Sequence, residues 1–133
     1  MKEVCDFLKK AGTYYLATCD GDQPRVRPFG TAHIFEDKLY IHTDYNKDVS
    51  KQMAANPKIE ISAFDGEVWV RICAVAVNDT NIEAAKSMLA AYPALEEALG
   101  FKAGDGRSQV LYLKDATASF YSFASPEVKT VTF

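Results

Sequence analysis

Four cationic side chains fall within a short stretch of the chain, and their types and spacing suit one kind of chemistry. Arg25 and Arg27 alternate along one predicted strand, and Lys47 and Lys51 lie one turn apart on a predicted helix. Thr43 ends the strand between them and adds a hydroxyl group. Planar guanidinium and compact ammonium groups both bind phosphate dianions well. The stretch therefore predicts a site for a phosphorylated ligand, with cations converging from neighbouring elements.

Each candidate also has an interpretation that involves no ligand. Arg25 and Arg27 would be ordinary exposed charges if their strand lay at a sheet edge, and two lysines four residues apart often form a solvated helix face. Trp69 is of a type that packs in cores and interfaces more often than against a cofactor. Arg71 shares a strand face with Trp69. Because an unpaired guanidinium is rarely buried, we expect Arg71 to meet a carboxylate, a phosphate or another subunit.

The hydrophobic pattern predicts the elements that position these residues. Helical spacing covers residues 2 to 11, 46 to 56 and 82 to 99, interrupted at Pro93, and strand patterns cover 14 to 19, 25 to 34, 39 to 43, 59 to 64, 68 to 78 and 110 to 123. Alternation predicts that the strand 39 to 43 is half-buried. The strand 68 to 78 is apolar on both faces, which predicts a central or doubly covered strand. The residues after Pro126 carry no strong signature.

Six or seven strands without regular strand-helix alternation favour a mainly β protein, a closed antiparallel barrel with helices at its ends. The length of 133 residues, 48% of them hydrophobic, fits a single domain over residues 1–133. A net charge of −3 makes nucleic acid an unexpected partner. No segment has the apolar length of a membrane span or a signal peptide, so we expect a cytoplasmic protein that does not contact membranes.

The cysteine and histidine content excludes other classes of site. The three cysteines are widely separated and form no C-x-x-C pair, which favours reduced thiols over disulfides or a zinc site. His33 and His42 are too few for a metal set, and neither adjoins a nucleophile motif. We therefore expect no metal, and no hydrolase chemistry.

Several short motifs, in this order, resemble a known family: QPRVRPFG from Gln23, LYIHT from Leu39, NKDVSKQM from Asn46, ANPKIEI from Ala55 and VWVRI from Val68. The chain resembles the pyridoxamine 5'-phosphate oxidase-like, FMN-binding split-barrel family over roughly residues 1 to 123, and within it the small single-domain members of the nitroimidazole-resistance type. The resemblance implies a homodimer of six-stranded antiparallel split barrels with FMN at the subunit interface.

The resemblance also assigns roles to residues of this sequence. Those expected to bind the cofactor are Arg25, Val26, Arg27 and Pro28 along the flavin, His42 and Thr43 beside the phosphate and ribityl chain, and Lys47 and Lys51 on the helix, with Trp69 and Arg71 as further candidates. One departure from the family concerns the helix. Asp48 and Val49 stand where the full-length oxidases carry an Arg-Lys pair, and the positive charge is found one position before and two after, at Lys47 and Lys51.

The resemblance implies a flavin-dependent oxidoreductase acting on a small molecule, either like pyridoxamine 5'-phosphate oxidase or like a nitroreductase. No catalytic acid or base can be named from the sequence, because a flavin carries out the electron chemistry itself. A non-catalytic redox sensor or carrier, or a site for haem or a deazaflavin, remains an alternative. The aromatic residues at 120 to 123 favour burial against a second copy. The glycine-containing loop 101 to 109 is predicted to approach the flavin and to shape a substrate pocket.

Overall fold

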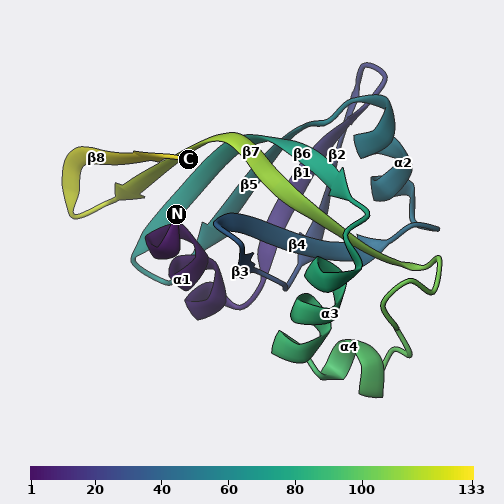
Figure 1. Ribbon diagram of the computed structural model, residues 1–133. Helices are drawn as coiled ribbons and strands as arrows, with labels where there is room; N and C mark the ends of the chain where they lie inside the picture. Colours follow the sequence, from purple (N-terminus) through teal and green to yellow (C-terminus); the bar gives the residue numbers. More distant parts are fainter.

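One antiparallel sheet of eight strands forms the body of the protein in the computed structural model, which describes all 133 residues (Figure 1). The strands are β1 (Tyr14–Asp20), β2 (Gln23–Phe29), β3 (His33–Phe35), β4 (Lys38–Asp44), β5 (Lys58–Phe64), β6 (Val68–Asp79), β7 (Ser108–Ser122) and β8 (Ser125–Thr132). Their order is β2-β1-β5-β6-β7-β4-β3, with β8 paired to β7. The predicted mainly β class is confirmed.

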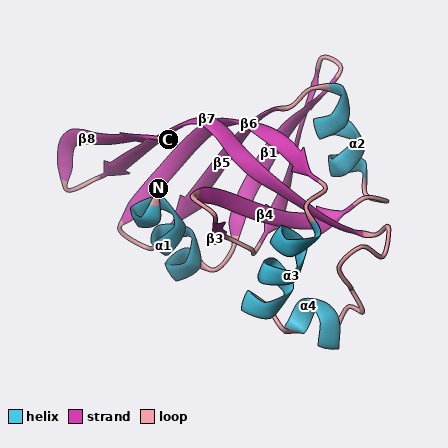
Figure 2. Ribbon diagram, in the orientation of Figure 1, coloured by secondary structure: helices cyan, strands magenta, loops and turns pink.

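Four helices lie around this sheet, as the colouring in Figure 2 shows. They are α1 (Lys2–Ala11), α2 (Asp48–Ala55), α3 (Ile82–Ala91) and α4 (Ala94–Glu97). Gly12 ends α1 with a φ of 78°, a left-handed conformation that favours glycine, and its amide donates to the Leu8 carbonyl. Asn81 caps α3 by accepting a hydrogen bond from the Glu83 amide. None of the helices has the length and apolar character needed to cross a membrane.

The sheet curls around one apolar cluster of 21 buried residues, to which β1, β4, β5, β6 and β7 all contribute. Alternation along the strands produces this core, since Ile59, Ile61 and Ala63 of β5 are buried while the residues between them are more exposed. Val4, Cys5 and Leu8 of α1, together with Val49 and Met53 of α2, add to the same cluster. Burial of these apolar side chains is the main force that holds the curled sheet together.

The barrel is open on one side, which corrects the expectation of a closed one. The two ends of the sheet, β2 and β3, do not pair with each other. They belong to one predicted strand, 25 to 34, which the structure interrupts at residues 30 to 32. The reason is that β2 has finished its pairing with β1, ending at Phe29 opposite Tyr14. The chain then turns away and pairs with β4 instead.

The prediction that the strand 39 to 43 is half-buried is wrong, because all five of its residues are buried. Leu39 and Ile41 face the main core, as expected from the alternation. Tyr40 is covered by α3, which packs Ala84, Ala85 and Met88 against it in a second small cluster. The spacing of polar and apolar residues did not reveal this cover, because Tyr40 is an amphipathic side chain found on buried and exposed faces alike.

Strand β6 is central, as predicted, and lies between β5 and β7. Only one of its faces is buried in the single chain. The unpredicted strand β8 follows from the length of β7, whose outer edge pairs with β4 only over Ser108 to Tyr112. The remaining edge, Thr117 to Ser122, takes β8 as its partner. Because β8 is mostly exposed, its sequence lacks the apolar alternation that would have predicted it.

Candidate functional site

The open side of the barrel holds two adjoining hollows of opposite character. One, which we call the basic groove, has a volume of about 640 Å³ and is lined by Asp20, Arg25, Val26, Arg27, Pro28, Lys47, Asp48, Val49 and Gln52. The other, the apolar chamber, has a volume of about 460 Å³ and is lined by Pro28, Phe29, Gly30, Thr31, His42, Thr43, Asp44, Lys47, Tyr92, Ala94, Leu95, Ala98, Leu99 and Phe101. Pro28 and Lys47 belong to both, so the two hollows meet there.

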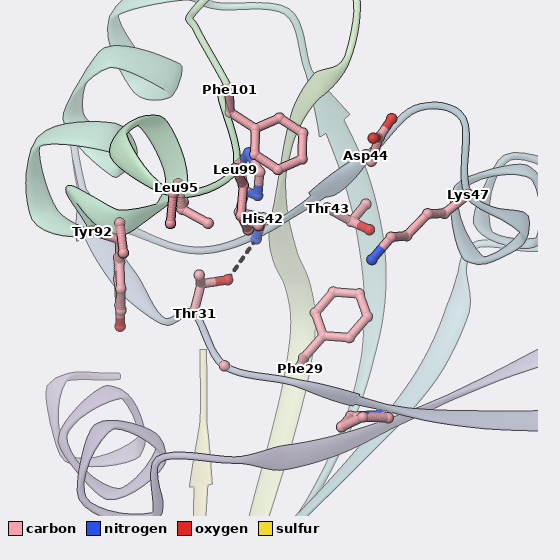
Figure 3. A pocket seen from close by; sticks show the side chains of 14 residues that line it. Phe29, Thr31, His42, Thr43, Asp44, Lys47, Tyr92, Leu95, Leu99 and Phe101 are labelled. Atoms are coloured by element: carbon pink, nitrogen blue, oxygen red, sulfur yellow. Dashed lines mark hydrogen bonds between the residues drawn. The ribbon is translucent and has the colours of Figure 1, made fainter.

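Lys47 is the cation with the greatest freedom in this site. It is exposed, forms no ion pair, and directs its ammonium group into the space between Phe29 and Thr43 (Figure 3). Lys47 is also the N-cap residue of α2, with extended backbone and no side-chain cap. The N-terminus of α2 lies at the basic groove, which Lys47, Asp48 and Val49 line, and its partial positive charge favours an anion there. Asp48, in the first turn, reduces this positive potential.

Arg27 is held in place by protein groups. Its guanidinium donates to Thr18 Oγ1 at 2.7 Å, to Gln52 Oε1 at 2.6 Å and to the Leu16 carbonyl at 3.2 Å. Thr18 in turn donates to the same Gln52 oxygen. Burial, with a smaller contribution from Arg25, lowers the pKa of Arg27, which stays far above neutrality for a guanidinium. Arg27 thus ties β1, β2 and α2 together at the bottom of the basic groove.

The other two predicted cations differ in position. Arg25 lines the basic groove and is engaged by Asp20, with 3.2 Å between Nε and Oδ2. Both side chains are about half exposed, so this ion pair is weak and a phosphate can compete for the guanidinium. Lys51 is exposed on α2 and lines neither hollow. The structure therefore brings Arg25, Arg27 and Lys47 together and leaves Lys51 outside.

Neutral polar groups form the floor of the apolar chamber. His42 is buried, and its Nε2 lies 2.8 Å from Ser108 Oγ. Burial lowers the pKa of His42 to about 4, against smaller opposing effects of Asp105 and Asp44, so the imidazole is neutral at pH 7. The His42 amide donates to Thr31 Oγ1 at 2.9 Å, a bond drawn in Figure 3. Thr43 is buried as a residue, and its hydroxyl has no side-chain partner.

Trp69 and Arg71 lie away from both hollows, on the outward face of the sheet. Arg71 pairs with Glu60 at 3.1 Å, which confirms the expected carboxylate partner. Trp69 stacks on Tyr121 with 5.3 Å between ring centroids and a 12° interplanar angle. Within one chain neither residue can touch a ligand in the groove. Their role as cofactor contacts stays a prediction that involves a second copy.

Several residues of the site have no individual signature in the sequence. Gln52 is one, although it follows Lys51 directly on α2. The apolar lining of the chamber is another case, because its residue types are common in any hydrophobic core: Phe29, Tyr92, Leu95 and Leu99. Phe101 begins the loop that was predicted to shape a pocket, and it does line the chamber. Across the 133 residues, no cluster of three or more His, Cys, Asp or Glu side chains could hold a metal ion.

Comparison with known proteins identifies the family of the chain. The family model described as pyridoxamine 5'-phosphate oxidase matches residues 1–120. The chain belongs to the pyridoxamine 5'-phosphate oxidase family. A crystal structure of a NimC/NimA family protein from Clostridium acetobutylicum is 39% identical, with a TM-score of 0.93, and the match covers 100% of this chain and 93% of that one. No curated protein sequence matches the chain.

More distant members of the pyridoxamine 5'-phosphate oxidase fold show its range. A pyridoxamine 5'-phosphate oxidase-related, FMN-binding protein from Nostoc punctiforme has 13% identity and a TM-score of 0.72, with 99% of this chain and 95% of that chain covered. A heme-binding protein from Mycobacterium smegmatis has 14% identity and a TM-score of 0.65, with coverage of 94% and 57%. At these identities the likeness concerns the fold alone. The resemblance stated from the sequence motifs is thus confirmed at the level of family and fold.

Proposed function

We propose that the chain binds FMN across the two hollows and acts as a flavin-dependent oxidoreductase on a small molecule. The observation that supports this most is the junction of a basic groove with an apolar chamber at Pro28 and Lys47. The two ends of FMN correspond to the two hollows, because FMN has a dianionic phosphate at one end and a flat, mostly apolar ring system at the other. A ligand with only one of these ends would leave half of the site unused.

The phosphate is assigned to the basic groove. Arg25, Lys47 and the first amides of α2 would contact it, and Arg27 would supply positive charge from its fixed position at the bottom. Lys51 is a less favourable candidate because it lines neither hollow. Thr43 and His42 would then lie beside the ribityl chain, and Thr43 offers an unused hydroxyl for it.

The ring is assigned to the wall formed by the end of β2. Pro28 and Gly30 present little side chain there, so a flat ring can approach the backbone. When bound, a flavin supplies hydride and electron transfer, and the protein contributes orientation and electrostatics. His42 is neutral and is fixed by Ser108, so it adds no charge beneath the ring. We accordingly assign no catalytic acid or base, and favour a reductase of small electrophiles.

A second copy of the chain is proposed to complete the site. Val26 lines the basic groove and is 67% exposed, so the groove borders on a large apolar side chain without cover. Tyr15, Phe64 and Trp69 lie on the same outward face, as the strand register shows. A homodimer through this face would cover Val26 and place partner residues over the groove.

The absorption spectrum of the freshly purified protein tests the cofactor. A flavin spectrum with FMN identified by mass after release supports the proposal, as does FMN uptake by the apoprotein. A Soret band would instead identify haem, and absence of any chromophore together with no FMN uptake would reject the flavin assignment. For activity, bound FMN should be reduced by NADH or NADPH faster than free FMN, and an unchanged rate would favour the redox carrier.

A further inference from the structure

The apolar chamber has walls that the phosphate and ribityl chain of a flavin do not need. Leu95 and Leu99 form its roof on the α4 segment, and Phe101 forms one end. In Figure 3 these three side chains stand across the chamber from Phe29 and Thr31. Leu99 lines the chamber and is 58% exposed. The roof therefore offers apolar surface above the place assigned to the flavin ring.

The end wall of the chamber is held rigidly. The Phe101 ring meets His42 edge-on with 4.7 Å between centroids, and the Arg107 guanidinium lies 4.5 Å from the Phe101 centroid on a cation-π contact. Arg107 also reaches Asp44 at 3.5 Å. The Asp105 carboxylate accepts from the amides of residues 102, 107 and 108 at 2.7 to 2.8 Å, which fixes the loop behind the ring.

The other end of the roof is anchored by Tyr92. Its hydroxyl donates to the Ala32 carbonyl at 2.9 Å and accepts from the Ala32 amide at 3.0 Å. These two bonds join the end of α3 to the link between β2 and β3. With both ends tied down, the intervening segment holds Leu95 and Leu99 beside the chamber. Such preformed apolar pockets with few polar groups are typical of small-molecule sites.

The polar groups of the chamber select an uncharged guest. His42 is neutral and has one ring nitrogen engaged by Ser108, so the second nitrogen is free of protein partners. Thr31 accepts from the His42 amide and keeps its own hydroxyl proton for another acceptor. Lys47 lines the chamber on the side where it meets the basic groove, and Asp44 is shared with Arg107. A dianion would be poorly solvated at the inner end, whereas one neutral hydrogen-bonding substituent can be satisfied.

We propose that the α4 roof, through Leu95, Leu99 and Phe101, forms the binding site for the second ligand: a neutral aromatic molecule of one or two rings with a single hydrogen-bonding substituent. This inference rests on the proposed function, because it takes the flavin ring to lie along β2 and leaves the roof side of the chamber for the reaction partner. Leu99 is the residue that sets the size of the guest.

The test uses 2-naphthol as the probe, by equilibrium dialysis against both the FMN-loaded protein and the apoprotein. Leu99→Trp should fill the chamber and weaken 2-naphthol binding by at least about tenfold, while FMN affinity changes by less than about twofold. The matched control is Glu97→Trp, which places the same ring on the exposed side of α4, outside the chamber, and should leave both affinities unchanged. Thermal unfolding confirms that each variant is folded.

Three results would overturn the inference. Wild-type protein in both forms could fail to bind 2-naphthol at millimolar concentration, or Leu99→Trp could leave its binding intact. Alternatively, Leu99→Trp could weaken FMN and 2-naphthol by the same factor, which would mean that the flavin ring itself fills the roof side. Failure of FMN to bind wild-type protein would reject the proposed function instead, and the dialysis of the apoprotein would still decide whether the chamber accepts the aromatic probe.

Discussion

At the scale of residues, the structure separates cations that look equivalent in the sequence. Lys47 and Lys51 form an ordinary pair one helical turn apart, and the sequence offers no reason to choose between them. The fold places Lys47 at the N-cap of α2, where it lines both hollows, and places Lys51 outside them. The position of α2 relative to β2 makes the difference.

Lys47→Ala should weaken FMN binding by about ten- to a hundredfold, because a charged phosphate contact contributes roughly 1.5 to 3 kcal/mol. Lys51→Ala, the matched control, should change the affinity by less than about twofold. Quenching of FMN fluorescence during titration of the apoprotein measures both. Equal losses in the two variants would show that Lys51 reaches the phosphate and belongs to the basic groove.

His42 should make the protein less stable in mild acid. Its pKa is lowered from 6.5 to about 4 in the folded protein, chiefly by burial, so the unfolded chain binds the proton more readily. The contribution of neutral His42 to the free energy of unfolding is fully present above pH 6.5. It is lost as the pH falls toward 4, by a total on the order of 3 kcal/mol. Urea unfolding at pH 7 and at pH 4.5 measures most of this loss.

His42→Gln is the comparison for that measurement, since glutamine does not titrate. The variant should be less stable at pH 7 but should lose less stability between pH 7 and pH 4.5 than the wild type. His33 is a useful second comparison, because burial and Lys9 also lower its pKa. If His42→Gln showed the full wild-type pH dependence, the acid sensitivity would belong to other groups.

At the scale of elements, the basic groove depends on the attachment of α2 to β1 and β2. The side-chain oxygen of Gln52, Oε1, accepts hydrogen bonds from both Arg27 and Thr18, so one side chain of α2 joins two strands. This link sets where the helix begins relative to β2 and therefore where Lys47 lies. Sequence periodicity predicted the helix from residue 46, whereas it starts at Asp48, a difference of the size expected for helix ends.

Gln52→Leu should lower the free energy of unfolding by roughly 1 to 3 kcal/mol, because it leaves the Arg27 guanidinium and the Thr18 hydroxyl without a partner in a partly buried place. FMN affinity should fall as well, since α2 loses its attachment. Gln23→Leu is the control: that side chain is exposed and bonds only to the neighbouring Pro24 carbonyl. Urea unfolding that showed the same loss in both variants would contradict the assigned role of Gln52.

At the scale of the whole molecule, one outward face of the sheet exposes several large apolar side chains to solvent in the single chain. Tyr15, Val26 and Phe64 are 51%, 67% and 55% exposed, and the register of β1, β2 and β5 puts them on the same side. Trp69 lies opposite Phe64 on β6 and extends this face. Exposed apolar surface of this kind marks interaction sites.

Phe64→Arg should therefore convert a dimer into a monomer in sedimentation at micromolar concentration, because the symmetric contact would bring charge into an apolar interface. FMN binding should weaken in the same variant if the partner covers the groove. Val128→Arg, at a similarly exposed valine on β8, should leave the assembly unchanged. A wild-type chain that sediments as a monomer would refute the proposed dimer.

The sequence by itself determined the class of the fold and most of the strands and helices, because hydrophobic alternation and turn residues are local signals. Its short motifs, through their resemblance to known proteins, indicated the family. The sequence also predicted an anion site built from four cations, Arg25, Arg27, Lys47 and Lys51, of which the structure brings the first three together. Only the tertiary structure decided which cations face the groove, that Tyr40 and His42 are buried, and that α4 roofs a chamber. These outcomes depend on contacts between residues far apart in the chain, such as Arg27 with Gln52 and Tyr92 with Ala32, which local patterns do not encode.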